Sequence, residues 1–336
     1  MQVAYETWGT LAPDGSNAVL VLHALTGDSH LSGPAGPGHP SPGWWDDLVR
    51  PGGPLSPDRW FVVCPNVLGG CQGTTGPASD APDGRPFGSR FPVITIRDQV
   101  EVEVALADAL GVERWAAVVG GSMGGMRVLE WAVGHPDRLA RAVVVACGAA
   151  ATAEQIALCA TQAQAIRLDP GFAGGDYYDA KPGTGPARGL GLARRIGHIS
   201  YRSELELAAR FANRAQGSED PFAGGRHQVE SYLDHQAAKL IARFDANSYL
   251  VLSRAMDLHD VGRDRGGVPT ALSRVSADVT VAGVDSDRLY PLRLQRELAE
   301  LLPGRPPLRL ITSDAGHDGF LIEVAQVGRV VSEALA

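Results

Sequence analysis

The chain has 336 residues, 44% of them hydrophobic and 20% charged, so it can bury a large core as one domain or as one domain with an insertion. Its net charge of −8, without a basic block, makes a nucleic-acid partner unexpected. No apolar run approaches the roughly 18 residues that a membrane span needs, and the first residues lack the basic and apolar regions of a signal peptide. We therefore expect a cytoplasmic protein without a membrane partner, whose cysteines are reduced thiols.

The first half of the chain alternates between apolar strands and amphipathic helices. Short apolar, β-branched runs predict strands, of which the first is an edge strand. Apolar residues at helical spacing predict a helix over residues 95–110, ended by Gly111, and another after residue 122. The predicted strands span residues 2–9, 18–22, 59–66, 116–119 and 139–147. This order predicts an α/β fold with a mostly parallel sheet and helices on both of its faces.

Residues 149–260 have a different pattern, because helical stretches dominate and no convincing strand lies among them. An insertion of helices into an α/β sheet indicates a lid over the strand ends. The expected lid helices span residues 154–166, 189–198, 204–212, 229–244 and 248–256. Strands at residues 277–283 and 308–311 and a helix from about residue 322 then resume the sheet pattern. We therefore divide the chain into a core domain of residues 1–148 and 261–336 and a helical lid of residues 149–260.

The stretch Gly120-Gly121-Ser122-Met123-Gly124 lies between a predicted strand and a predicted helix. The spacing Gly-x-Ser-x-Gly in this context indicates a nucleophile elbow, in which the serine stands on a strained turn. Glycines on either side let the strand and the helix approach closely, and the helix N-terminus favours a developing negative charge. We predict Ser122 as the nucleophile; the alternative is a glycine-rich turn with an idle serine.

A second loop is expected to help Ser122 by binding the oxyanion. The sequence His23-Ala24-Leu25-Thr26-Gly27 follows a predicted strand, and an α/β-hydrolase places its second oxyanion donor at this point. The N–H group of Leu25, or that of Thr26, is therefore expected to bind one oxygen together with the N–H group of Met123. The alternative is an ordinary turn at a strand end.

The remaining catalytic groups come from the end of the chain. Asp285 and Asp287 follow a late strand and His317 follows the last one, which gives the α/β-hydrolase order Ser…Asp…His. We favour Asp287 over Asp285 because it stands four residues before Pro291. In such a triad His317 removes the serine proton, and Asp287 fixes the imidazole tautomer and stabilises the imidazolium.

Motifs along the whole chain resemble those of the homoserine O-acetyltransferase family, which has the α/β-hydrolase fold. They run from the first residues to near the C-terminus, and several are long and unusual. They are YETWG (5–9), HALTG (23–27), NVLGGC (66–71), GGSMGGM (120–126), SYLDHQ (231–236), RFDANSY (243–249), DRLYP (287–291) and GHDGFL (316–321).

This resemblance implies a ping-pong acyl transfer with acetyl-CoA as a co-substrate, and no cofactor or metal. Ser122 takes the acetyl group from acetyl-CoA, and the γ-hydroxyl of L-homoserine then receives it, with His317 as the general base. The product, O-acetyl-L-homoserine, would serve methionine biosynthesis. The lid would keep water from the acetyl-enzyme, and a homodimer through the lid helices is implied.

The resemblance also assigns Arg194, Tyr201 and Asp318 to the acceptor. Arg194 offers a bidentate fork to the α-carboxylate, with Arg195 as an adjacent competitor, and Asp318 offers an anion to the α-ammonium. Seven positions separate Arg194 from Tyr201. If their helix persists past His198, both side chains lie on one face beneath the lid.

Two rival functions remain open at this point. A plain esterase or thioesterase would use the same triad with water as the acceptor, although the amino-acid anchors of the lid argue against it. A sister transferase would use succinyl-CoA as the donor or serine as the acceptor, because one side chain in an acyl pocket could change the donor.

Overall fold

The computed structural model describes residues 1–181 and 184–336. Its strands form one seven-stranded sheet in the order β1-β3-β2-β4-β5-β6-β7. The pairing of β1 with β3 is antiparallel and all other pairings are parallel, so the predicted mostly parallel sheet is confirmed. The strands are β1 (Tyr5–Trp8), β2 (Ala18–Leu22), β3 (Phe61–Pro65), β4 (Ala117–Gly121), β5 (Arg141–Val145), β6 (Asp278–Val284) and β7 (Arg309–Ile311).

Helices cover both faces of this sheet, as the sequence predicts. Successive side chains of a strand point to opposite faces, so Leu20 and Leu22 of β2 pack into one apolar cluster and Val19 and Val21 into another. The first cluster includes side chains of α2 (Ile96–Ala109), α3 (Met123–Gly134) and α10 (Leu292–Leu301). The second includes α1 (Asp46–Val49) and α12 (Val324–Leu335). Burial on both faces explains why the central strands are apolar throughout.

The ends of the predicted elements are set by local chemistry. The edge strand is shorter than the predicted residues 2–9: Gly9 ends it with a φ of 81°, and Gln2 and Ala4 bond the loop after β3 instead of continuing the strand pairing. Helix α2 begins behind Thr95, which forms a capping box with Asp98. The last helix is divided into α11 (Gly319–Ile322) and α12, and short 3-10 turns lie at η1 (Gly88–Arg90), η2 (Pro136–Arg138), η3 (Pro170–Gly175), η4 (Pro221–Ala223) and η5 (Gly316–Asp318).

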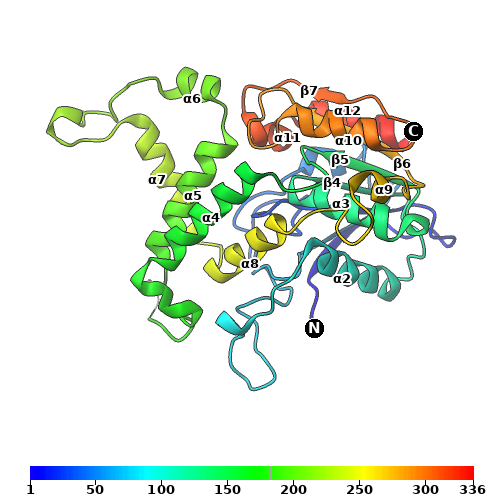
Figure 1. Ribbon diagram of the computed structural model, residues 1–336, viewed down its shortest axis with the longest axis horizontal. Helices are drawn as coiled ribbons and strands as arrows, with labels where there is room; N and C mark the ends of the chain where they lie inside the picture. Colours follow the sequence, from blue (N-terminus) through cyan, green and yellow to red (C-terminus); the bar gives the residue numbers. More distant parts are fainter. Residues whose placement is uncertain (182–183) are drawn as a thin grey trace.

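Between β5 and β6, where the sequence predicts a helical lid, the described residues form helices and no strand. Figure 1 shows α4, α5, α6 and α7, in green and yellow-green, lying together to one side of the sheet. Helix α5 is longer than the predicted 189–198 at both ends, which matters for the site below. The helices are α4 (Ala153–Arg167), α5 (Ala187–Tyr201), α6 (Glu204–Phe211), α7 (Gln228–Ile241), α8 (Ala246–Asp257) and α9 (Val268–Leu272).

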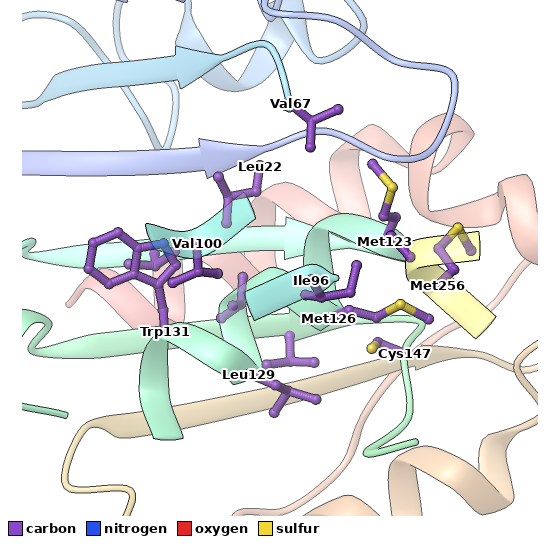
Figure 2. Packing of buried hydrophobic residues seen from close by; sticks show 14 of the residues in the cluster. Leu22, Val67, Ile96, Val100, Met123, Met126, Leu129, Trp131, Cys147 and Met256 are labelled. Carbon is purple, nitrogen blue, oxygen red and sulfur yellow. The ribbon is translucent and has the colours of Figure 1, made fainter. Parts of the chain in front are cut away.

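Contacts at the base of the insertion attach it to the core. The outgoing and returning chains pair beside each other, since Ala151 N–H donates to His259 O at 2.9 Å and Val261 N–H donates to Ala149 O at 3.0 Å. In Figure 2, Met256 of α8 lies beside α3, the helix that follows Ser122, and belongs to the same apolar cluster as its methionines. Across the described residues, no helix combines the length and the apolar character that crossing a membrane requires.

Candidate active site

Ser122 stands alone between the end of β4 and the start of α3, with φ 57° and ψ −124°. A positive φ is strained for a residue with a side chain and persists only where the surroundings enforce it. The flanking glycines provide this enforcement. A Cβ at Gly120 would lie 2.6 Å from the carbonyl of Gly124, and a Cβ at Gly124 would collide with the Leu22 carbonyl oxygen at the end of β2. The Gly-x-Ser-x-Gly spacing therefore lets β2, β4 and α3 converge beneath one hydroxyl that lines a cavity.

The structure brings Ser122, His317 and Asp287 into one hydrogen-bonded row. His317 Nε2 lies 2.8 Å from Ser122 Oγ, and His317 Nδ1 lies 2.6 Å from Asp287 Oδ2. The other oxygen of Asp287 accepts from the N–H groups of Leu289 and Tyr290 at 2.9 and 2.8 Å. The three residues are 4–5% exposed, so this row lies out of bulk water. The row can move a proton from a serine hydroxyl to an imidazole that a carboxylate holds in place.

Asp287, rather than Asp285, is the carboxylate that contacts His317. Asp285 is exposed and accepts a hydrogen bond from the backbone N–H of Ser313 at 3.0 Å. Its role is to tie the loop after β6 to the loop after β7. The two aspartates are only two positions apart, but the turn that begins at Val284, whose carbonyl accepts from Asp287 N–H, sends their side chains to different places.

The electrostatics around His317 favour its charged form. Burial lowers the pKa of His317, but the charge of Asp287, its hydrogen bond and the more distant charge of Asp318 outweigh burial and raise the pKa above the ordinary value of 6.5. The ring of Tyr290 stacks on the imidazole at 4.9 Å between centroids. The site is thus arranged to stabilise an imidazolium while keeping the ring in one orientation.

The N–H groups of Leu25 and Met123 make no hydrogen bond to any part of the chain that the structure describes. Met123 is the first residue of α3, where the helix dipole adds to the positive end of its N–H bond. Leu25 lines the cavity beside Ser122. The N–H group of Thr26, the alternative donor, likewise has no partner in the described chain, while the Thr26 carbonyl accepts from Arg243 Nη1 at 2.8 Å. Both predicted donors are therefore free to bind a ligand oxygen.

A cavity of about 240 Å³ lies above Ser122 and His317, between the strand ends and α5. The loop after β2 and the loop of residues 28–44 form part of its wall, and the lid forms another part. Its lining residues are Ala24, Leu25, Thr26, Gly27, Asp28, Ser41, Pro42, Trp44, Ser122, Arg194, Tyr201, Arg243, Met256, Leu289, His317, Asp318, Phe320 and Leu321. The cavity suits a small polar molecule or the reactive end of a larger one.

The three residues expected to hold the acceptor line this cavity. Because α5 extends to Tyr201, Arg194 and Tyr201 share one helix face, and the guanidinium lies 5.7 Å from the tyrosine ring. Arg194 Nη1 lies 3.5 Å from Thr26 Oγ1, while its Nε is buried without a hydrogen-bond partner among the described residues. Asp318 forms an ion pair with Arg202 at 3.3 Å. Arg195, the competitor, pairs with Asp234 at 2.9 Å.

Arg243 and Arg202 were not predicted as site residues. Arg243 lines the cavity, and its burial together with the charge of Arg194 lowers its pKa, which Asp28 partly offsets. The two guanidiniums make this side of the cavity cationic. Arg243 stands in one of the motifs that carry the resemblance, but nothing in a single sequence places it beside Thr26, 217 positions away.

One group of side chains outside the cavity has the composition of a metal site. Ligand atoms of Glu6, His30 and His39 all lie within 4.8 Å of one another. The two imidazole rings, however, stack at 3.9 Å with 12° between their planes. An ion lies in the plane of each imidazole that binds it, and nearly parallel planes cannot share one ion. In this arrangement His30 Nδ1 instead bonds Glu6 at 3.0 Å and ties the loop after β2 to β1.

A family model described as the alpha/beta hydrolase fold matches residues 17–324. The chain is 61% identical to the homoserine O-acetyltransferase of Thermobifida fusca over 336 residues, which cover 100% of this chain and 88% of that relative. Nothing in this identity depends on a short motif, since it extends along the whole chain.

Two crystal structures of similar fold carry different names. That of homoserine O-acetyltransferase from Bacillus anthracis superposes with a TM-score of 0.91 at 29% identity, covering 99% of this chain and 91% of that one. That of esterase E22 superposes with a TM-score of 0.90 at 28% identity, covering 99% and 94%. The overall fold therefore does not distinguish acyl transfer to an acceptor from acyl transfer to water.

Proposed function

This chain belongs to the homoserine O-acetyltransferase family of the α/β-hydrolase fold, and we propose from that premise that it moves the acetyl group of acetyl-CoA to the γ-hydroxyl of L-homoserine. The observation that carries the proposal is the union of two features in one cavity. Ser122 and His317 of the buried row with Asp287 form its floor, and Arg194 stands in its wall with a buried Nε that has no partner among the described residues. The first performs acyl transfer, and the second selects an anionic acceptor.

In the first half-reaction the serine is acetylated. His317 Nε2 takes the proton of Ser122 Oγ, which attacks the thioester carbonyl, and the N–H groups of Leu25 and Met123 bind the resulting oxyanion. Collapse of this intermediate breaks the carbon–sulfur bond. The CoA sulfur leaves with the proton from His317, and an acetyl ester remains on Ser122.

In the second half-reaction the acceptor takes the place of CoA. His317 removes the proton of the homoserine γ-hydroxyl, whose oxygen attacks the acetyl carbon. The bond to Ser122 Oγ breaks, the serine regains its proton from His317, and O-acetyl-L-homoserine leaves. This chemistry uses only side chains and backbone amides, with acetyl-CoA as a co-substrate and without a cofactor; its product would serve methionine biosynthesis.

The acceptor is held by its charges. Arg194 binds the α-carboxylate, with Arg243 adding positive charge nearby, and Asp318 binds the α-ammonium. Asp318 is shared with Arg202, which keeps the carboxylate in place before the acceptor arrives. Tyr201 closes the wall under Arg194. A zwitterion fits this pair of opposite charges, whereas water gains nothing from them.

A homodimer and a cytoplasmic location stay predictions. For the dimer, Leu192 and Ile199 of α5 and Leu205 of α6 are exposed apolar side chains of the lid. A second copy could cover them.

A matrix of donors and acceptors tests the proposal. Acetyl-CoA and succinyl-CoA are each mixed with the enzyme and with L-homoserine, L-serine or water alone, and the products are identified by mass spectrometry. We expect O-acetyl-L-homoserine to form much faster than acetate, succinyl esters or O-acetylserine. Release of acetate at an undiminished rate in the presence of homoserine would favour the esterase function that the likeness to esterase E22 allows.

A further inference from the structure

His23 lies at the end of β2, behind the cavity wall, and is only 2% exposed. Its ring makes two hydrogen bonds. Nε2 lies 3.1 Å from the backbone N–H of Val67 and accepts from it, so the neutral ring carries its proton on Nδ1. Nδ1 then donates to the carbonyl oxygen of Ala24 at 2.8 Å. Burial, followed by the charge of Arg127, lowers the pKa of His23 to about 3, so the ring keeps this tautomer at neutral pH.

The Ala24 carbonyl is thereby held from two sides. It accepts from His23 Nδ1 and, at 2.9 Å, from the backbone N–H of Gly27. All peptide bonds in the described chain are trans. In a trans peptide the C=O and the following N–H lie in one plane and point in opposite directions. Fixing the Ala24 oxygen therefore fixes the direction of the Leu25 N–H, which is free of partners in the described structure and borders the cavity.

The neighbouring peptide is held just as firmly. The carbonyl of His23 accepts from Arg127 Nη2 at 2.6 Å, and Arg127 Nη1 donates to Glu103 at 2.6 Å. Arg127 is fully buried in α3, the helix that starts at the nucleophile. The turn also packs on the ring, because a Cβ at Gly27 would lie 3.0 Å from His23 Cβ and 3.3 Å from Nδ1. The loop after β2 is thus tied to the helix that carries the other free N–H.

We propose that His23 is a positioning residue for acyl transfer: through the Ala24 carbonyl, its Nδ1–H aims the Leu25 N–H at the oxyanion. This inference rests on the proposed function in one respect, namely that Leu25 stabilises the oxyanion. His23 itself touches neither substrate nor Ser122. Its effect is on the transition state, where the charge on the oxygen is largest, and not on binding of the acceptor.

Two substitutions separate the two hydrogen bonds of the ring. The carboxamide of Asn reaches only as far as Nδ1, so His23→Asn keeps a donor for the Ala24 carbonyl and loses the acceptor for Val67. The carboxamide of Gln reaches as far as Nε2, so His23→Gln keeps the acceptor for Val67 and loses the donor. A role in stability alone predicts that activity falls together with the thermal midpoint. The positioning role predicts that His23→Gln loses activity, because it lacks the donor for the Ala24 carbonyl. It predicts that His23→Asn keeps most of its activity even if its thermal midpoint falls.

The readouts are chosen so that the natural acceptor is not needed. They are the rate of Ser122 acetylation by p-nitrophenyl acetate, the inhibition constant of an alkylthio trifluoromethyl ketone, which forms a tetrahedral adduct with its oxygen in the oxyanion site, and the thermal midpoint. Removing one oxyanion donor costs about 10²–10³ in rate, and a misdirected donor should cost somewhat less. We expect His23→Gln to lower the acetylation rate about 10- to 100-fold and to weaken the ketone by a similar factor. We expect His23→Asn to lose less than about fivefold in either, despite a lower thermal midpoint.

For homoserine, KM should stay within about threefold of the wild-type value in both variants, because neither bond reaches the acceptor site. Equal losses of rate in both variants, or a loss that follows the thermal midpoint, would overturn the positioning role. If wild-type enzyme forms an acetyl-enzyme but does not pass it to homoserine, the proposed function fails while the comparison of the two variants still decides on His23.

Discussion

The floor of the cavity and its lid wall differ in how many of their polar side-chain atoms have hydrogen-bond partners without a ligand. In the floor, Asp287 and His317 have partners for both of their polar atoms within hydrogen-bonding distance. In the wall, Arg194 has a long contact to Thr26 and a buried Nε without a partner in the described chain. Because the hydrogen bonds of the floor are complete, Ser122 can be acylated whatever the acceptor is. The wall gains its missing contacts when an acceptor binds, so the floor carries out the chemistry and the wall selects the acceptor.

The largest effect should come from removing the nucleophile from the floor. Ser122→Ala should form no acetyl-enzyme with acetyl-CoA, because no other hydroxyl hydrogen-bonds to His317 Nε2 in the described structure. Intact-protein mass spectrometry after mixing with acetyl-CoA alone should show a single acetyl adduct on the wild type only. An adduct on the variant would remove Ser122 from the mechanism, and an unchanged thermal midpoint would show that the variant is folded.

The next largest effect tests whether the floor depends on Asp287. Asp287→Asn should lower kcat by about 10³–10⁴, as for other triad aspartates, because the amide no longer favours the required imidazole tautomer. Asp285→Asn is the matched control, since Asp285 is exposed and its carboxylate accepts from the Ser313 N–H rather than from His317. We expect less than a tenfold change for it. The opposite ranking would show that the carboxylate beside His317 is not the one that acts.

The floor could be predicted from the sequence because its parts are local. Gly120, Ser122 and Gly124 encode the elbow within five positions, and Asp287 and His317 each follow a strand whose apolar pattern is plain. Parallel strands bring their carboxyl ends to one edge of the sheet, so the order of these motifs along the chain is enough to bring them together.

The wall could not be predicted in the same way. Arg194 and Tyr201 were assigned through resemblance, and their shared face depended on how far α5 continues, which the sequence left open; it ends at Tyr201. Arg243 was missed because its contact with Thr26 depends on how the lid folds back over the core. The link from His23 to Leu25 was missed for another reason. It follows from the orientation of one peptide plane, which no residue type encodes.

In the wall, Arg194→Ala should affect the acceptor and leave the donor reaction intact. The variant loses a charged hydrogen bond worth about 1.5–3 kcal/mol, so the KM for homoserine should rise about tenfold to a hundredfold. Release of CoA in a single turnover without homoserine should be unchanged. Arg195→Ala is the control, because Arg195 pairs with Asp234 and does not line the cavity.

A loss of CoA release equal to the loss of turnover in Arg194→Ala would place this arginine at the donor or in the structure of the lid. A rise in KM that is equal in Arg195→Ala would mean that the lid responds to any loss of charge on α5. Either result would contradict the assignment of acyl transfer to the floor residues and of acceptor selection to the wall residues.

The smallest effect lies where floor and wall meet, at Asp318. His317 acts as a base only when neutral, so the rate of Ser122 acetylation rises with pH through its pKa, which lies above 6.5. Burial is the largest single effect and lowers this pKa, while Asp287 and, after it, the negative charge of Asp318 raise it. Asp318→Asn removes that charge and the ion pair with Arg202, which keeps Glu206 as its other partner, and loss of the negative charge disfavours the imidazolium. The acid limb of the acetylation rate should therefore move to lower pH, by less than about one unit.

Measuring acetylation by acetyl-CoA without homoserine keeps the α-ammonium out of the experiment, and Asp314→Asn, at an exposed position of the same loop, is the control. The same sign applies to stability: the raised pKa of His317 stabilises the folded state at low pH, and this contribution is lost as the pH rises through it. A shift of the acid limb to higher pH in Asp318→Asn would contradict the assigned electrostatics. No shift would mean that the charge of Asp318 does not affect the pKa of His317.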